Sequence, residues 1–194
     1  MSKVKKIALA SLLLSALVLS RLISIQTELL RTGIGFMPIV LCGILLGPWW
    51  CAGIAALGDV VGMTLFPKGV FFPGFTLSTF LAGLIYGFFL YNTKNNKQFL
   101  IHLIIASLLV TVFVNIGLNS LWLMITTKKA SLAFIPARIL ANAIKLPLKI
   151  ASIFLLKLFI DPLVKKFLLE SKDTNEFIPP VEAKKQEYKV ETNL

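Results

Sequence analysis

Six apolar runs dominate this chain of 194 residues and are the feature that most limits its fold. A helix needs about 20 predominantly apolar residues to span a bilayer. We therefore predict an all-α polytopic membrane protein with six transmembrane helices. The runs cover residues 7–25, 36–47, 49–66, 76–91, 99–125 and 134–169.

Proline and glycine separate several of these runs. Gly47-Pro48 divides one long apolar block, because proline cannot continue a helical hydrogen-bond ladder. Residues 67–75 hold two prolines and two glycines, which excludes a regular helix there. The same stretch carries Phe71, Phe72 and Phe75, which need something to pack on. This phenylalanine group fits a lid over a pocket or an anchor at the membrane interface.

The charged residues predict the topology. Only 15% of residues are charged, against about a quarter in soluble domains, so the formal net charge of +11 does not indicate nucleic-acid binding. With a cytoplasmic N-terminus, eight Lys and Arg residues near the membrane edges lie inside and four outside, which predicts that both termini are cytoplasmic. We expect a membrane domain over residues 1–169 and a polar, disordered cytoplasmic tail over 170–194.

The start of the chain has two interpretations. Lysines precede the first apolar run, as in a signal peptide. However, no small-x-small cleavage site follows the run, and Arg21 interrupts the position where one is expected. We therefore expect this helix to be retained.

Catalytic and metal-binding residues are scarce. Cys42 and Cys51 lie in apolar context without C-x-x-C spacing and are expected to be buried free thiols. His102 is the single histidine, with no metal-ligand partner or nucleophile motif beside it. We therefore predict no cofactor, no metal and no enzyme activity, and disfavour an intramembrane enzyme acting on lipid or peptide.

Four ionisable residues fall at membrane depth, where charge is costly and marks function or a buried partner. They are Arg21, Asp59, Arg138 and Lys145. Arg138 and Lys145 are two helical turns apart on one face, and the cations outnumber the acids. An anionic ligand would balance them. Asp59 either forms an interhelical ion pair or accepts the N–H donors of a ligand ring, and the sequence leaves both open.

Polar and small residues suggest two further surfaces. Asn115 and Asn119 are four residues apart, with Trp122 three further on, so amides and an indole share one helix stripe. Such amides bond a neighbouring helix or a heteroaromatic ligand. Ser11 and Ser15 give small residues at four-residue spacing on the first helix, which allows close packing within the protein or docking of a second protein.

Several segments belong together, and the Phe-Pro-Gly-Phe-Thr-Leu run of residues 72–77 is the specific one among them. They are Gly35-Phe36-Met37-Pro38-Ile39, Gly47-Pro48-Trp49-Trp50, Gly58-Asp59, Leu65-Phe66-Pro67-Lys68-Gly69, Phe71-Phe72-Pro73-Gly74-Phe75-Thr76-Leu77-Ser78, Asn119-Ser120-Leu121-Trp122-Leu123, and Arg138 with Lys145 and Pro147. Together they resemble the folate-specific S components of energy-coupling factor (ECF) vitamin transporters. The resemblance covers residues 7–160 and leaves out the tail.

The resemblance implies a multi-pass protein of the bacterial cytoplasmic membrane that captures folate at its extracellular side without hydrolysing ATP. Its partners would be the lipid bilayer, a transmembrane T component and two ABC-type ATPases, and it would topple in the membrane to deliver the vitamin. The family docks through Ala-x-x-x-Ala on the first helix, where this chain has Ser11 and Ser15.

Folate would use the residues described above. Arg138, Lys145 and either Arg21 or Lys68 would neutralise its two carboxylates. Its rings would stack on Trp122 and the phenylalanine group. Asp59 or the two asparagines would accept hydrogen bonds from the donor edge of the pterin. Two alternatives remain: another anionic vitamin such as pantothenate, or a transporter or channel that acts without partners.

Overall fold

The computed structural model describes residues 3–22, 25–26, 31–32, 35–67, 72–93, 95–127 and 134–173. Strands β1 and β2 pair antiparallel, with Ile25 opposite Thr32. The predicted all-α class is confirmed, with this short strand pair as an addition. The elements are α1 (Lys3–Ser20), β1 (Ile25–Gln26), β2 (Arg31–Thr32), α2 (Phe36–Leu46), α3 (Pro48–Leu65), α4 (Pro73–Leu90), α5 (Asn96–Leu109), η1 (Val110–Leu118), α6 (Asn119–Thr127) and α7 (Phe134–Asp173).

Within the described residues, three helical segments are long and apolar enough to cross a membrane: Pro73–Leu90, Asn96–Thr126 and Arg138–Phe159. Helix α2 is apolar but has only 11 residues. Large apolar side chains also point outward from the helices, as a surface surrounded by lipid requires. Examples are Leu12, Leu57, Phe88, Phe113 and Leu140.

The predicted break between α2 and α3 is confirmed. Gly47 has φ +88°, a left-handed conformation that favours glycine, and Pro48 opens α3, where its missing N–H costs no hydrogen bond. This junction packs closely on the end of α4. A Cβ on Gly87 would collide with the Cα of Pro48, and a Cβ on Gly47 would lie 3.3 Å from the Tyr91 ring.

The predicted start of the fourth helix is wrong by one turn. Helix α4 begins at Pro73 rather than at Thr76, so residues 73–75 are helical although the prolines and glycines of this stretch predicted no regular helix there. Proline is well suited to the first helical position, because its φ is already helical and its absent N–H would have no partner there. Phe72 is the extended residue before it.

The predicted fifth helix, residues 99–125, is continuous but not uniform. It consists of α5, the π-helix η1 and α6. In a π-helix the backbone bonds run from i to i+5, and such turns occur frequently at functional sites. The first helix also differs from its prediction. It runs from Lys3 to Ser20, and Arg21 and Leu22 close it with turn hydrogen bonds to Val18 and Leu19.

The chain divides into two compact units, residues 1–153 and 154–194. The first contains every element up to the first half of α7. In the second, the structure describes the rest of α7 as far as Asp173. The predicted boundary after residue 169 stays a prediction, and residues 174–194 of the predicted tail lie outside the described residues.

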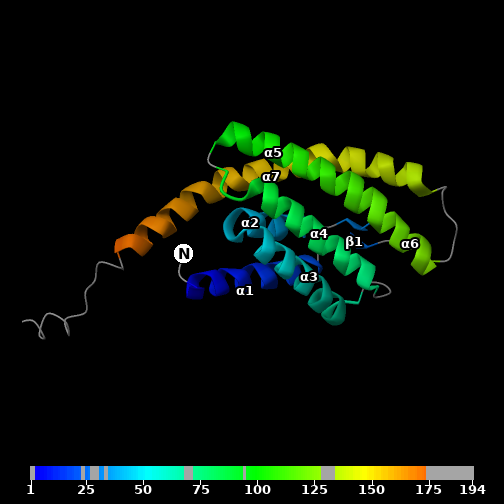
Figure 1. Cartoon of the computed structure of the whole chain (residues 1–194), viewed down its shortest axis with the longest axis horizontal. Coiled ribbons are helices and arrows are strands. Elements are labelled where there is room, and N and C mark those ends of the chain that lie inside the picture. The colour runs from blue at the N-terminus through cyan, green and yellow to red at the C-terminus, as the bar shows by residue number, and fades with distance from the viewer. Residues whose placement is uncertain are drawn as a thin grey trace, which may run out of the picture. The chain divides into compact units, whose positions relative to one another are not determined.

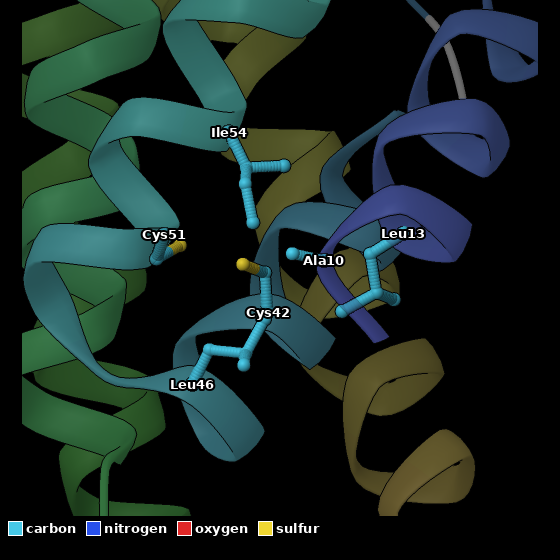
Figure 2. Packing of buried hydrophobic residues seen from close by; sticks show 6 residues of the cluster. All are labelled: Ala10, Leu13, Cys42, Leu46, Cys51 and Ile54. Atoms are coloured by element: carbon cyan, nitrogen blue, oxygen red, sulfur yellow. The ribbon is translucent and has the colours of Figure 1, made fainter. Parts of the chain in front are cut away.

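In the first unit, α4 packs against α2, α3 and α5 (Figure 1). A second contact region joins α1, α2 and α3 around a buried apolar cluster (Figure 2). The cluster residues are Ala10, Leu13, Cys42, Leu46, Cys51 and Ile54. Figure 2 shows the two sulfur atoms turned toward each other, and both thiols are free and buried, as the sequence predicts.

Candidate functional site

An ion pair joins the end of α1 to α3. Arg21 lies in the turn after α1, and its Nη2 donates to Asp59 Oδ1; Asp59 is only 3% exposed. Thr76 on α4 donates to the other carboxylate oxygen at 2.8 Å. Gly62, one turn after Asp59, leaves the space that the Arg21 side chain fills. Of the two interpretations of Asp59, the structure therefore supports the interhelical ion pair.

Three aromatic side chains meet near the start of α4: Phe72 just before the helix, Phe75 in its first turn, and Trp122 on α6. The ring centroids of Phe72 and Phe75 are 6.1 Å apart at an interplanar angle of 78°, and those of Phe72 and Trp122 are 5.6 Å apart at 49°. The indole N–H of Trp122 donates to Ser78 Oγ at 3.0 Å. The aromatic platform predicted from the sequence is thus brought together, whereas Phe71 lies outside the described residues.

The two asparagines lie side by side where η1 passes into α6. Asn119 Nδ2 donates to Asn115 Oδ1 at 3.5 Å. Asn119 Oδ1 and the hydroxyl of Ser120 are buried without a hydrogen-bond partner among the described residues. Buried polar groups almost always have a partner, so each exception needs an explanation such as an absent ligand. Ser120 was not predicted as a site residue, since an isolated serine in an apolar helix carries no distinguishing pattern.

Arg138 turns toward these asparagines from α7. Its guanidinium donates to the main-chain carbonyls of Asn119 at 3.4 Å and Asn115 at 3.5 Å. Both bonds are long, and Nε is buried without a partner. Within the described part of the chain, no carboxylate lies at ion-pair distance from Arg138. A partly buried guanidinium held by carbonyls alone retains capacity for an anion.

Two lysines continue the same face of α7. Lys145 lies two turns after Arg138 and is half-buried. Lys149 lies one turn further, with Nζ 5.1 Å from the ring centroid of Tyr86 and 5.5 Å from that of Phe36. Its ammonium therefore rests on aromatic rings, a contact worth about 0.5–2 kcal/mol.

The structure thus collects a cation, two amides and three aromatic rings around α4, α6 and the start of α7. Arg21 and Asp59 bind each other, and Thr76 connects that pair to the turn of α4 that carries the rings. Lys68 lies outside the described residues. No group of three or more His, Cys, Asp or Glu side chains able to hold a metal occurs in the part of the chain that the structure describes. The arrangement suits an anionic ligand with aromatic rings.

Comparison with protein families agrees with this chemistry. A family model described as "ECF transporter, substrate-specific component" matches residues 5–157. The chain belongs to this family. The resemblance inferred from the sequence motifs is confirmed, and the family is one of transporter components rather than enzymes.

Relatives of this ECF substrate-specific component carry more specific names. A folate transporter FolT of Clostridium novyi (strain NT) is 39% identical over 142 residues, covering 73% of this chain and 81% of the relative. A folate transporter FolT of Leuconostoc mesenteroides subsp. mesenteroides is 36% identical over 156 residues, covering 77% and 83%. A solved structure, "Crystal structure of FolT bound with folic acid", has 39% identity and a TM-score of 0.69, covering 77% of this chain and 89% of that one.

The first helix of this S component exposes a stripe of small residues. Ser11 and Ser15 are both exposed, and each hydroxyl donates to a carbonyl of its own helix, Ser11 to Ala8 at 2.9 Å and Ser15 to Leu12 at 2.8 Å. Because the hydroxyls are satisfied locally, the outer surface at these positions is small and nearly apolar. It is therefore closer to the alanine pattern than the residue types alone suggest.

Proposed function

We propose that this S component captures folate with high affinity for ATP-driven uptake by a shared module of one T component and two ABC-type ATPases. The observation that carries this is the guanidinium of Arg138, partly buried, without an acidic partner in the described residues, and beside the amides of Asn115 and Asn119. A dianionic vitamin supplies the missing negative charge. The folate transporters among its relatives support the same ligand.

The carboxylates of folate are assigned to the cations of α7. Arg138 and Lys145 share a helix face, and a carboxylate between them would relieve the repulsion of their like charges. Arg21 is assigned to Asp59 instead, since these two form an ion pair. Lys68 remains a predicted contact for the second carboxylate.

The rings of folate are assigned to the aromatic platform of Phe72, Phe75 and Trp122. Offset or edge contacts with such rings add about 0.5–1.5 kcal/mol each beyond the burial of area. The acceptor Oδ1 of Asn119 and the hydroxyl of Ser120 are available to read the polar edge of the pterin. Asp59 does not make this contact in the proposed site, because both of its oxygens are already bonded.

The topology that fits this site has six spanning segments: α1, α2, α3, α4, the continuous α5–η1–α6, and α7. Alternation then brings the ends of α1, α3 and α6 and the starts of α4 and α7 to one side. The ring platform and Arg138 come from these ends. With both termini in the cytoplasm, as the lysine and arginine distribution favours, that side is extracellular. The membrane is the cytoplasmic membrane of a bacterium, in keeping with the bacterial relatives.

Uptake follows from binding and docking without chemistry on the ligand. Folate binding would shift the population of the outer segments toward a closed form. The stripe of Ser11 and Ser15 would then dock the T component, and toppling of the whole S component would carry the vitamin inward when the ATPases act.

Equilibrium binding to the purified protein tests the ligand. Folic acid should bind with nanomolar affinity and pantothenate should not compete. Tight pantothenate binding without saturable folic acid binding would replace folate by the alternative vitamin.

Reconstitution tests the partners. Proteoliposomes should accumulate folic acid only when the T component, both ATPases and ATP are present. Uptake by the S component alone would identify a transporter that works without partners.

A further inference from the structure

Two residues of α4 hold the indole of Trp122, and the motifs that suggested the site assign neither of them a role. Gly74 and Ser78 lie four residues apart, one turn, so they share a face of α4. Both are buried, and Ser78 is only 1% exposed. We refer to Gly74 and Ser78 as the indole seat.

Ser78 orients the N–H edge of the Trp122 indole. Its Oγ accepts the hydrogen bond from Trp122 Nε1 at 3.0 Å. The indole N–H is the only hydrogen-bonding group of a tryptophan side chain. Since Ser78 uses it, Trp122 has no donor left for a ligand and can offer only the faces of its ring.

Gly74 allows the centre of the Trp122 indole to lie close to the backbone of α4. A Cβ built on Gly74 would lie 2.5 Å from Trp122 Cδ2 and 2.8 Å from Cε2, the two atoms shared by both rings of the indole. The same Cβ would lie 2.5 Å from Cε1 of Phe72. Cβ contacts under 3.0 Å essentially never occur, so any side chain at position 74 would push the indole or Phe72 away.

We infer that Gly74 and Ser78 are positioning residues that set the tilt of Trp122 and so select a flat, fused heteroaromatic ring by stacking. This rests on the proposed function, because it assumes that Trp122 contacts the ring of the ligand. In this arrangement different residues recognise the shape and the polar groups of the ligand. The indole selects ring shape, while hydrogen bonding falls to the buried polar atoms of Asn119 and Ser120, which have no partner among the described residues.

A double-mutant cycle measured by folic acid binding tests the inference. Ser78→Ala should weaken folic acid binding on the order of tenfold, because the buried indole N–H loses its acceptor and the ring is no longer oriented. In a Trp122→Phe background, which has no N–H, Ser78→Ala should change affinity by less than about twofold. Equal losses in both backgrounds would overturn the positioning role of Ser78, since the serine would then act through general stability.

Matched controls exist on neighbouring helices. Ser107 on α5 is also a fully buried serine, but the indole N–H of Trp122 donates to Ser78 and not to it, so Ser107→Ala should leave folic acid affinity unchanged. Gly74→Ala should weaken binding by more than tenfold, whereas Gly53→Ala should not, because nothing lies within 4 Å of a Cβ at Gly53. Equal effects of Gly74→Ala and Gly53→Ala would overturn the role of Gly74. If Gly74→Ala does not fold, the Ser78 cycle decides alone.

Failure of the inference is distinct from failure of the proposed function. Wild-type protein that binds folic acid but gives an additive cycle retains the function and loses the indole seat. Wild-type protein that binds pantothenate, which has no aromatic ring, in place of folic acid would overturn both.

Discussion

Arg21 and Asp59 form an ion pair that connects the turn after the first helix to the middle of the third. The carboxylate is 3% exposed and the arginine side chain 13%, so both charges are largely removed from solvent. Removing one partner of such a pair leaves the other charge buried and uncompensated. Loss of either partner should therefore lower the stability of the protein.

Asp59→Asn should lower the free energy of unfolding by about 3–5 kcal/mol, because Arg21 would keep its charge without a counter-ion. Asparagine still offers an oxygen to Thr76, so the loss reports the charge rather than the hydrogen bond. The thermal unfolding midpoint of the protein in detergent measures it. The double variant Arg21→Gln with Asp59→Asn should be more stable than Asp59→Asn alone, and the opposite order would contradict the assignment.

Arg138→Ala should weaken folic acid binding by more than about tenfold, because a charged contact at a desolvated site is lost. Arg138→Lys should recover only part of the affinity, since an ammonium cannot reproduce the fork of donors that reaches two carbonyls and, in the proposed site, a carboxylate of folate. Isothermal titration measures both. Lys97→Ala, at an exposed position on α5, is the control. Unchanged affinity in Arg138→Ala would remove this residue from the site.

Ser15→Phe should abolish folate uptake while folic acid binding stays intact, because a large ring on the small stripe of α1 prevents close approach of a partner helix. Ser15→Ala should transport normally, since the hydroxyl is bonded to its own helix and offers nothing outward. Uptake into proteoliposomes with the complete module, paired with a binding measurement, separates the two effects. Persisting transport in Ser15→Phe would place docking elsewhere.

Gly87→Ala should destabilise the protein by about 1–3 kcal/mol or more, the usual range for overpacking, because the added Cβ collides with Pro48 at the start of α3. Gly53→Ala adds the same methyl group where space is open and should leave the unfolding midpoint nearly unchanged. Thermal unfolding of the two variants side by side is the measurement. A similar midpoint for both would show that the α3–α4 contact is looser than described.

Much of the architecture follows from local sequence. The Gly47-Pro48 break, the buried thiols and the continuous helix before residue 127 come from rules that act within a few residues. The first turn of α4 did not follow, because a proline that ends one helix starts another equally well.

The site was predictable by residue type but not by pairing. Arg138, Asn115, Asn119 and Trp122 were found because polar or aromatic residues stand out in an apolar run. Asp59 was found too, but its partner was left open, since which helices touch is decided by packing that periodicity does not contain. Ser78 was missed for the same reason: its role exists only through Trp122, 44 positions away.

The π-helix η1 restricts how the sequence of this protein can evolve. Each residue added to or removed from a helix rotates everything beyond it by about 100° and shifts it by about 1.5 Å. Insertions and deletions within Val110–Leu118 would therefore rotate Trp122 away from Ser78 on α4 and Asn119 away from Arg138. Substitutions at its exposed positions, such as Val112 and Phe113, meet only the surrounding lipid, whereas a change of length moves every residue beyond it. Among homologous chains that keep the same ligand, the spacing between α5 and Trp122 should be invariant even where exposed residues in between, such as Val112 and Phe113, are not.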